Sequence, residues 1–434
     1  MKAREVNRRQ FLKSAASLTT SAIAFPYVVS SSALSKAICV APSNRIVMAC
    51  IGMGGKGTNN IEAFLSSEEV RVVAVCDVDK KQRDKARKIV DDKYQNNHCK
   101  AYLDFREVIE RQDIDALSLA LPDHWHSVPA IMAARAGKDM YAEKPLARTI
   151  REGRAMADAV HRYGCVWQTG SQQRSTSNFH RACELVRNGR IGKVHKVEVG
   201  LPTGKSGRTI PVEPVPEGLD WDFWLGPAPW RPYMGFGRNG PHGSWRWIMD
   251  YSGGQLTDWA GHHIDIAHWA LDLERTGPVE IEGRGVYPID GTYDVPIEYK
   301  FTCKYANGLV MTVANDEQIP RGTKWYGQDG WIYVKRGKLE ADPPSVLNEV
   351  IGPNEVRLYK SNDHKQNFLD CVKSRRETIA PIEVGHRSIS VGLLGEIAML
   401  TERKLKWDPE KEIFLNDEQA NRMLSRPMRS PWHL

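Results

Sequence analysis

Asp258 and His262 have the residue types and the spacing for proton transfer. They lie four residues apart, so on a helix both side chains emerge from the same face. An imidazole that titrates near neutral pH, next to a carboxylate, suits removal of a hydroxyl proton while a hydride leaves the same carbon. The segment also fits a helix capped by Thr257 or Asp258 that buries the histidine without any chemistry. Spacing alone leaves both interpretations open.

Two sets of residues have spacings that a metal ion could use, and we predict that neither binds one. Carboxylate and imidazole groups are ligands of divalent ions, and the first set comprises Asp258, His262, His263 and Asp265. The second set, His124 and His126, alternates as on a strand, but the sequence suggests no further ligand for it.

A glycine turn with the spacing Gly52-x-Gly54-x-x-Gly57 is typical of dinucleotide binding. It follows an apolar run at 45–51 and precedes a helical pattern, and Asp77 ends the next apolar run, 20 residues after Gly57. The first glycine permits the tight turn, the second lets the backbone approach the pyrophosphate, and the third allows close packing of helix on strand. The free N–H groups of the helix N-terminus then face the phosphates.

The residues around this turn also predict which dinucleotide binds. Asp77 would accept hydrogen bonds from a ribose diol and repel a 2′-phosphate, so we predict NAD rather than NADP as the cofactor. Lys80 and Lys81 lie nearby and weaken that preference. Met53 and Gly55, inside the turn, complete the predicted cofactor-binding segment.

The apolar runs divide the chain into two styles of secondary structure. From Asn44 to about residue 170, apolar strands alternate with helical patterns, which is typical of a buried parallel sheet with crossover helices. After about residue 190, alternating segments and candidate hairpins at Asn307-Gly308 and Asp329-Gly330 indicate an open antiparallel sheet. The sequence therefore predicts an α/β protein: an N-terminal Rossmann domain with a doubly wound parallel sheet, and a C-terminal α+β domain with an open, mainly antiparallel sheet. The expected segments are 1–40 (N-terminal signal), 41–170 (Rossmann domain), 171–400 (substrate-binding domain) and 401–434 (C-terminal extension).

Several motifs resemble those of one enzyme family, in the family's order. Leu121-Pro122-Asp123-His124-Trp125-His126 is followed by Ala142-Glu143-Lys144-Pro145, then by the segment from Gly253 to Asp265, and later by Glu383-x-Gly385-His386-Arg387. Together they resemble the Gfo/Idh/MocA oxidoreductases over nearly the whole chain after the N-terminal segment. The resemblance implies a two-domain enzyme that moves a hydride between a nicotinamide cofactor and a sugar or polyol.

The resemblance also implies roles for individual residues. Lys144 would hydrogen-bond the reacting hydroxyl and stabilise developing alkoxide charge, whereas in isolation it would be interpreted as a solvated surface lysine. His262 would act as the base, with Asp258 as its orienting or substrate-binding partner, and Glu143 would contact the nicotinamide ribose. The other expected contacts of the cofactor or substrate are Pro122 and His126 on the nicotinamide side, and Gln173 and Arg174 beyond the Rossmann strands.

A tryptophan-rich loop follows the predicted first domain. Six of the thirteen tryptophans fall within 39 residues, at positions 221, 224, 230, 245, 247 and 259. Aromatic faces can stack on sugar rings, and we assign Trp259, which adjoins Asp258, to the substrate site. Packing of the loop or of a subunit contact explains most of the others equally well.

The N-terminus carries most of the net charge. Six Lys and Arg against one acidic residue in the first 40 residues supply +5 of the +7. The nearly neutral remainder gives no electrostatic footprint for nucleic acid. Asn7-Arg8-Arg9-Gln10-Phe11-Leu12-Lys13, followed by a weakly apolar stretch to Val29, is typical of a twin-arginine (Tat) signal. We therefore predict export by the Tat machinery to the periplasm, without a lipid anchor at Cys39, because Lys36-Ala37-Ile38 is a poor lipobox.

These observations favour an exported NAD-dependent oxidoreductase that acts on a sugar, glycoside or cyclic polyol. Because an exported enzyme meets no cytoplasmic NAD pool, we expect a tightly held cofactor that a second substrate regenerates or that serves a redox-neutral cycle. The redox-neutral alternative is a glycoside hydrolase of the α-N-acetylgalactosaminidase kind, which oxidises C3 transiently. A non-catalytic sugar-binding protein is the second alternative, and the intact set of Lys144, Asp258 and His262 argues against it. We expect a homo-oligomer that pairs through the open sheet.

Overall fold

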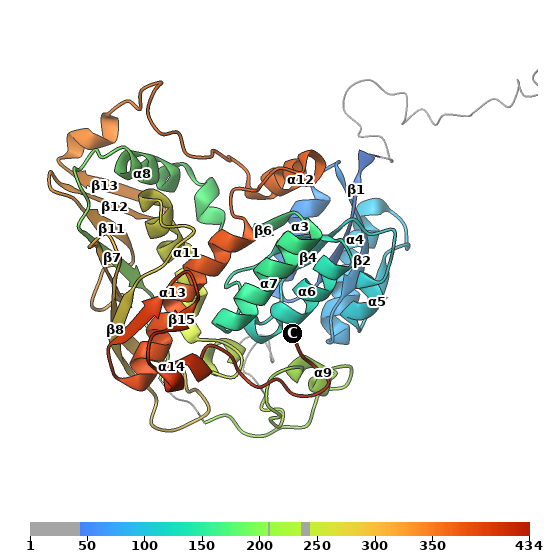
Figure 1. Ribbon diagram of the computed structural model, residues 1–434. Helices are drawn as coiled ribbons and strands as arrows, with labels where there is room; N and C mark the ends of the chain where they lie inside the picture. The colour runs from blue at the N-terminus through green and yellow to red at the C-terminus, as the bar shows by residue number, and fades with distance from the viewer. Residues whose placement is uncertain (1–43, 207–208, 236–243) are drawn as a thin grey trace, which may run out of the picture. The chain divides into compact units, whose positions relative to one another are not determined.

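The computed structural model describes residues 44–206, 209–235 and 244–434 (Figure 1). The predicted twin-arginine segment and Cys39 lie outside the described residues, so the export prediction stays a prediction. Residues Ile46–Leu434 form one unit by their contacts, and this unit contains two sheets.

The N-terminal half contains a six-stranded sheet in the order β3-β2-β1-β4-β5-β6, and its pairings are parallel. Its strands are β1 (Ile46–Ile51), β2 (Val70–Cys76), β3 (Lys100–Tyr102), β4 (Ala116–Leu119), β5 (Asp139–Ala142) and β6 (Trp167–Thr169). The helices that connect them are α3 (Gly55–Leu65), α4 (Lys80–Tyr94), α5 (Phe105–Ile109), α6 (Ser127–Arg135) and α7 (Ile150–Tyr163). The strand order reverses at β1, as in a doubly wound sheet, so the predicted Rossmann fold is confirmed.

Local sequence explains where these elements begin and end. β1, β2 and β4 are apolar runs with few accessible residues, as a sheet covered on both faces by helices requires. α4 begins after Asp79, whose side chain accepts a hydrogen bond from the Lys81 N–H, and α7 begins after Thr149, which accepts one from the Glu152 N–H. α7 ends at Gly164, whose φ of +64° is the left-handed conformation of a C-cap. The two N-caps lie in loops at the carboxyl ends of the strands, where the glycine turn also lies.

The C-terminal half contains a nine-stranded sheet in the order β13-β12-β11-β7-β10-β9-β8-β14-β15. Its strands are β7 (Lys196–Leu201), β8 (Glu280–Val286), β9 (Glu298–Lys304), β10 (Val310–Asn315), β11 (Gly322–Tyr326), β12 (Trp331–Lys335), β13 (Lys338–Asp342), β14 (Leu405–Asp408) and β15 (Ile413–Phe414). β7 and β10 pair in parallel, and the other neighbours pair antiparallel. The two hairpins predicted at Asn307-Gly308 and Asp329-Gly330 are present, as β9–β10 and β11–β12. The predicted mainly antiparallel sheet is thus confirmed.

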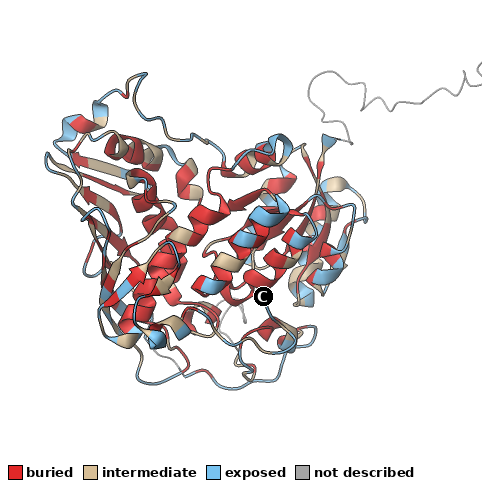
Figure 2. Cartoon of the chain, viewed as in Figure 1, coloured by how far each residue is buried: buried red, intermediate tan, exposed pale blue. Residues whose placement is uncertain are grey.

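Three long helices cover one face of the nine-stranded sheet. They are α8 (Ser177–Arg187), α11 (Gly254–Leu271) and α13 (Ile382–Thr401). α11 contacts β7, β11, α8 and α13, and α13 contacts β8 and β9 as well as α7 of the Rossmann half. α11 and α13 are buried along nearly their whole length (Figure 2), because they have protein on more than one side. Side chains of α11 therefore stand between the two sheets.

Three later segments pack against the Rossmann half. We call residues 216–233 the strap and residues 426–432 the tail, and the third segment is α12 (His364–Ser374). α12 packs Phe368 against Phe64 of α3 and Tyr141 of β5. Shorter helices complete the described fold: η2 (Asp123–Trp125), η3 (Gln172–Ser175), α9 (Trp221–Leu225), η5 (Trp245–Trp247), η6 (Pro344–Asn348) and α14 (Glu418–Arg422). The predicted domain boundaries stay predictions, and the chain crosses between the two sheets several times.

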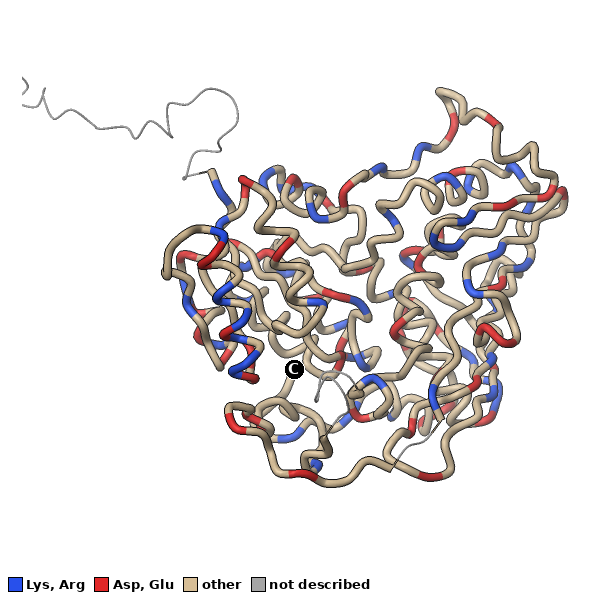
Figure 3. The backbone as a smooth tube through the Cα atoms, turned by 180° about the vertical axis from the view of Figure 1, so that it is seen from behind, with Lys and Arg blue, Asp and Glu red and all other residues tan. Residues whose placement is uncertain are grey.

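Charged side chains of both signs are interleaved along the chain (Figure 3). Many of them pair locally, as Lys88 does with Asp92 on α4 at 2.9 Å. Among the described helices, none is both long and apolar enough to cross a bilayer.

Candidate functional site

The Lys144 ammonium and the Asp258 carboxylate form a short ion pair where α11 meets the end of β5. Lys144 Nζ donates to Asp258 Oδ1 at 2.7 Å and to the Asp258 carbonyl oxygen at 3.1 Å. Arg246 approaches the same carboxylate, with its Nε 3.1 Å from Oδ1. Burial raises the pKa of Asp258, but Lys144 and Arg246 together outweigh it and hold this pKa below its ordinary value. The carboxylate is therefore ionised, and the ammonium keeps one N–H for a further acceptor.

His262 lies one helical turn after Asp258. Its ring is buried, and its Nδ1 has no hydrogen-bond partner among the described residues. Burial, followed by the charges of Lys144 and Arg336, lowers the pKa of His262 well below its ordinary value. The imidazole is therefore neutral at physiological pH, and its low pKa makes it a weak base. The structure thus brings Lys144, Asp258 and His262 together, and their predicted roles stay predictions.

α11 is anchored where it carries these residues. The helix begins at Gly254, which has a φ of +70°, so neither Thr257 nor Asp258 is its N-cap and the capping interpretation is wrong. Thr257 Oγ1 instead accepts a hydrogen bond from the Gly253 N–H at 3.1 Å. Ser171 Oγ donates to the Gly261 carbonyl oxygen at 2.9 Å. This last contact ties α11 to the Rossmann half.

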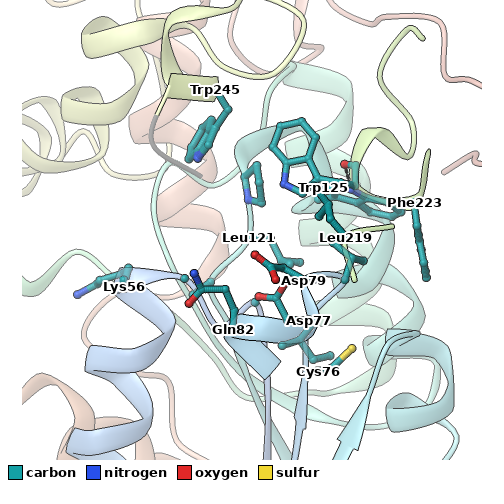
Figure 4. Close-up of a pocket in the computed structure, with 18 of the residues that line it drawn as sticks. Lys56, Cys76, Asp77, Asp79, Gln82, Leu121, Trp125, Leu219, Phe223 and Trp245 are labelled. Atoms are coloured by element: carbon teal, nitrogen blue, oxygen red, sulfur yellow. Dashed lines mark hydrogen bonds between the residues drawn. The ribbon is translucent and has the colours of Figure 1, made fainter. Parts of the chain in front are cut away.

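A cavity of about 880 Å³ lies at the carboxyl ends of the Rossmann strands (Figure 4). The predicted residues that line it are Gly52, Gly54, Gly55, Asp77, Pro122, Glu143 and Lys144. In Figure 4, Asp77 and Asp79 lie between Lys56 on one side and Trp125 and Phe223 on the other. The lysine of the ion pair therefore reaches the same cavity as the glycine turn.

The glycine turn fits the pyrophosphate of a dinucleotide. A Cβ at Gly57 would lie 1.8 Å from the Gly52 carbonyl oxygen, and Gly52 has a φ of +85°, so the turn itself requires glycine at both positions. Cβ atoms at Gly54 and Gly55 would meet nothing within 4 Å. The space beside these two glycines is open, and α3 begins there with its first N–H groups available to an anion.

Two carboxylates of the cavity fit the ribose hydroxyls of NAD. The oxygens of Asp77 accept hydrogen bonds from the N–H groups of Met53 at 2.6 Å and Asp79 at 2.8 Å, which fixes the orientation of the carboxylate. Glu143 Oε1 accepts from Asn60 Nδ2 at 3.0 Å, whereas its buried Oε2 has no partner within the described ranges. An orphaned buried acceptor calls for a donor, and a ribose hydroxyl is one.

The two kinds of glycine should respond differently to alanine. We expect Gly54→Ala to leave the free energy of unfolding nearly unchanged, because its Cβ enters open space. The same methyl group should weaken NAD binding by roughly 5- to 150-fold, which corresponds to about 1–3 kcal/mol of overpacking. Gly57→Ala should instead lower the melting temperature of the free protein. Calorimetric titration with NAD and thermal unfolding measure the two effects, and an equal loss of stability in both variants contradicts the assignment.

His126 and Gln173 are buried and do not line this cavity. His126 Nε2 lies 2.8 Å from the Leu121 carbonyl oxygen and Nδ1 3.2 Å from that of Leu146. The ring therefore supports the loop that carries Pro122 instead of lining the cavity as predicted. Neither amide atom of Gln173 has a partner among the residues that the structure describes, so its predicted ligand contact stays a prediction.

Arg174 has a structural environment. Its Nε and Nη2 donate to the Asp265 carboxylate at 2.7 and 2.8 Å, and its Nη1 donates to Glu274 at 2.7 Å. Only 2% of its side chain is exposed. Burial disfavours the charge, but the two carboxylates outweigh it and raise the pKa of Arg174 above its ordinary value. With its donors engaged inside the protein, Arg174 links η3 to α11, and the predicted substrate contact is corrected to a structural one.

Most of the tryptophan cluster is a core. The buried members are Trp221, Trp224, Trp245 and Trp247. Trp221 stacks on Trp224, with ring centroids 4.7 Å apart. The packing explanation is therefore confirmed for these four, although Trp224 and Trp245 also reach the cavity wall. Trp259 is only partly buried and lies beside His262, with ring centroids 5.6 Å apart.

The strap closes one side of the cavity and was not predicted as an element. The Lys80 N–H donates to the Gly218 carbonyl oxygen at 2.9 Å, and the Asp220 N–H donates to that of Val78 at 3.2 Å. The strap thus attaches to the chain just beyond β2, where Asp77 lies. The strap residues that line the cavity are Pro216, Glu217, Leu219, Phe223, Trp224 and Tyr233. No local signal in the sequence identifies this pairing, because its partner is distant along the chain.

The tail holds the strap from the outside. The guanidinium of Arg429 pairs with the Asp222 carboxylate and donates to the Asp222 carbonyl oxygen at 2.6 Å. Trp432 stacks on Phe223, with centroids 5.5 Å apart, and meets Trp125 edge-on at 4.7 Å. Phe223 and Trp125 both line the cavity. The tail therefore braces two parts of the cavity wall.

Within the described ranges, no group of three His, Cys, Asp or Glu side chains is placed to hold a metal ion. Members of both candidate sets have other partners: Asp265 pairs with Arg174, and His124 Nε2 lies 3.1 Å from the Trp224 carbonyl oxygen.

Comparison with known proteins identifies the family. Residues 46–171 match an oxidoreductase family's NAD-binding Rossmann fold, and residues 177–434 match the same family's C-terminal alpha/beta domain. Myo-inositol 2-dehydrogenase of Thermotoga maritima is 30% identical over 375 residues, which are 82% of this chain and 97% of that protein. Alpha-N-acetylgalactosaminidase of Shewanella oneidensis is 28% identical over 211 residues, 44% of each chain.

A solved structure shows the same fold. The aldose-aldose oxidoreductase from Caulobacter crescentus, complexed with glycerol, superposes with a TM-score of 0.61 at 19% identity, over 83% of this chain and 99% of that chain. The predicted NAD-binding Rossmann domain and the predicted family are both confirmed by the matched domains. The chain belongs to the Gfo/Idh/MocA family of NAD-binding oxidoreductases.

Proposed function

We propose that this protein transfers a hydride between NAD and a hydroxyl-bearing carbon of a sugar, glycoside or cyclic polyol. The proposal rests on the contact of Lys144 with Asp258 at 2.7 Å. Lys144 lies at the wall of the cavity, and neutral His262 lies one helical turn after Asp258. Oxidation of an alcohol removes a hydride from carbon and a proton from oxygen. The three side chains supply a hydrogen-bond donor, an orienting carboxylate and a proton acceptor for that oxygen.

Each side chain has a separate task. NAD, when bound, supplies the carbon that accepts or returns the hydride. Lys144 donates its remaining N–H to the substrate oxygen and stabilises the negative charge that develops there. Asp258 holds the ammonium in place through its carboxylate and its carbonyl oxygen, and Arg246 helps to keep that carboxylate ionised. His262 takes the hydroxyl proton at its imidazole while the hydride leaves. Its low pKa opposes this step and favours return of the proton when the hydride is returned.

The cofactor is held through turnover in this proposal. The strap encloses one side of the cavity, and the tail holds the strap in place through Arg429 and Trp432. Exchange of the cofactor needs these contacts to open. A resident cofactor suits an enzyme that works where no NAD pool exists.

Trp432→Ala should speed the loss of bound NADH by about tenfold, because an aromatic pair contributes about 0.5–1.5 kcal/mol and Trp432 contacts two aromatic residues of the wall. The rate is measured as the decay of NADH fluorescence after mixing with excess NAD. Trp230→Ala is the matched control: this side chain lies on the strap but is 66% exposed, so its loss should leave the rate unchanged. Equal rates in both variants would show that the tail does not retain the cofactor.

The first test is chemical. Protein purified without added cofactor is denatured, and the released nucleotide is identified; folded protein is scanned for NADH absorbance when sugars and polyols are added. Stoichiometric NAD or NADH that changes redox state with a sugar supports the proposal. No bound nucleotide, and no affinity for NAD at millimolar concentration, overturns it and leaves a sugar-binding protein.

A redox-neutral glycoside hydrolase is the second candidate. It is favoured by the 28% identity with alpha-N-acetylgalactosaminidase, which covers 44% of this chain. The same site would oxidise a ring carbon transiently and return the hydride after cleavage. Product analysis separates the two: a keto sugar marks the oxidoreductase, and a released aglycone without net NADH marks the hydrolase.

Export and self-association complete the proposal. The Asn7–Lys13 segment supports passage through the Tat machinery to the periplasm. Cell fractionation of a variant with Arg8 and Arg9 changed to lysine tests export.

The face of the nine-stranded sheet opposite α11 and α13 supports a homo-oligomer. On β9, Glu298, Lys300 and Thr302 alternate with buried residues and are more accessible to solvent than those buried residues. Because this face carries both charge signs, it suits pairing with the same face of a second copy. Light scattering of the purified protein tests self-association.

A further inference from the structure

We propose that the substrate side of this site takes an anionic sugar or glycoside, whose carboxylate or sulfate group is bound by Arg336 with Arg321 beside it. The inference rests on the proposed function and narrows its substrate class. It starts from a cluster of cations around Trp259 that the chemistry described above leaves unused.

Both arginines lie on the indole of Trp259, the residue after Asp258. The Arg336 guanidinium carbon is 4.8 Å from the ring centroid and that of Arg321 is 5.4 Å from it. The same indole lies beside His262, with ring centroids 5.6 Å apart. The arginines and the proposed proton acceptor therefore contact the same aromatic ring.

Arg336 has no direct ion pair within the described part of the chain, and the Asp258 carboxylate attracts it from a longer distance. It lies in the turn between β12 and β13, is exposed, and precedes Gly337, whose φ is +74°. Arg321 is already paired, since its Nε lies 3.1 Å from Asp316 Oδ2. Trp259 thus contacts one guanidinium that has an ion-pair partner and one that has no direct partner.

Cations also gather around the Asp258 carboxylate. Lys144 and Arg246 share the single carboxylate of Asp258, and Arg336 adds a third cation. Burial, Arg336 and Arg321 lower the pKa of His263 to about 3, so that this ring is neutral. A carboxylate or sulfate beside Arg336 therefore gains a charge interaction that a neutral sugar lacks.

The indole preorganises the arginines for this contact. Trp259 stacks on His263 with centroids 5.5 Å apart, which fixes its plane. A guanidinium held over that ring loses less conformational freedom on binding than a free one. Its planar fork matches two oxygens of a carboxylate or sulfate. Trp259, predicted as a sugar platform, therefore supports the arginines that bind the sugar's charged group.

The test compares matched substrates on the holoenzyme. Methyl glucoside, methyl glucuronide and glucose 6-sulfate are assayed with the original protein, Arg336→Gln and Lys338→Gln. We expect Arg336→Gln to raise KM for a charged substrate by about tenfold or more, since hydrogen bonds between charged groups are the strong ones, and to leave KM for the neutral glucoside unchanged. A change in kcat that all three substrates share reflects the effect of Arg336 on the pKa of His262. Lys338 is the control, because it follows the same turn but pairs with Glu340 at 2.8 Å.

The glucuronide and the sulfate distinguish the two sources of the anion. Turnover of neutral sugars with no advantage for charged ones, and no effect of Arg336→Gln, overturns the inference and leaves the oxidoreductase proposal intact. If no sugar is oxidised, calorimetric titration with glucuronate and with glucose 6-sulfate decides the inference separately. Binding that Arg336→Gln abolishes supports the anion site without the proposed reaction, and absence of binding overturns it.

Discussion

Replacing Lys144 with methionine should lower kcat by about 10²–10⁴-fold, the range for loss of a positioned acid–base or charge-stabilising group, while NAD stays bound. Methionine keeps the length of the side chain but has no N–H to give to the substrate oxygen. Asp258 keeps Arg246 as a counter-ion at 3.1 Å, so the free energy of unfolding should change by about 1 kcal/mol or less. Single-turnover reduction of bound NAD measures the rate, and denaturation followed by nucleotide analysis measures the occupancy.

Lys56→Met is the matched control for that experiment. Lys56 lines the same cavity and lies 3.3 Å from Glu143, but its side chain is 47% exposed. We expect this variant to keep most of its kcat. A Lys144→Met variant that arrives without any nucleotide assigns Lys144 to cofactor binding, and one with unchanged kcat removes it from the mechanism.

Replacing Arg174 with methionine should reduce the free energy of unfolding by about 3–5 kcal/mol, the cost of breaking a buried ion pair by removing one partner. The loss leaves the Asp265 carboxylate, buried on α11, with only the Ser388 hydroxyl at 2.9 Å among the partners described here. The arginine also lies over the ring of Trp269, with its guanidinium carbon 4.9 Å from the centroid, so packing is lost as well. Urea unfolding measured by tryptophan fluorescence quantifies the effect.

Arg275→Met is the matched control, because it removes the same charge from an ion pair that is exposed instead of buried. Arg275 pairs with Glu377 at the same distance of 2.7 Å, but both side chains are more than half exposed. A pair of this kind contributes about 0–1 kcal/mol, so the control should unfold almost as the original protein does. An Arg174→Met variant that keeps its stability but loses sugar turnover would restore the substrate contact first predicted for it.

The sequence identified the parts of the site that depend on short-range patterns. The glycine turn, the acid at the end of β2 and the spacing of Asp258 and His262 are local features, and each follows from one element. Lys144 could be joined to them only through the family resemblance, because its contact with Asp258 spans 114 residues.

The contacts that sequence reasoning missed are tertiary. Arg246 lies in a tryptophan-rich loop whose path no periodicity indicates, and it reaches Asp258 only in the folded chain. Arg174 was assigned to the substrate because its type suits an anion, whereas the fold surrounds it with two carboxylates of its own, Asp265 and Glu274. A charged residue type predicts that a partner exists, and the fold decides whether that partner is a ligand or another side chain.

The tail has a consequence for the order of events during synthesis. Arg429 and Asp222, which it joins to the strap, are 207 residues apart. A nascent chain that has completed its Rossmann sheet and glycine turn therefore still lacks the brace behind Phe223 and Trp125. Such a chain can meet NAD from the cytoplasm but can release it again. Lasting capture of the nucleotide should begin only when residues 426–432 have left the ribosome, so that retention of the cofactor reports a fully synthesised and folded enzyme.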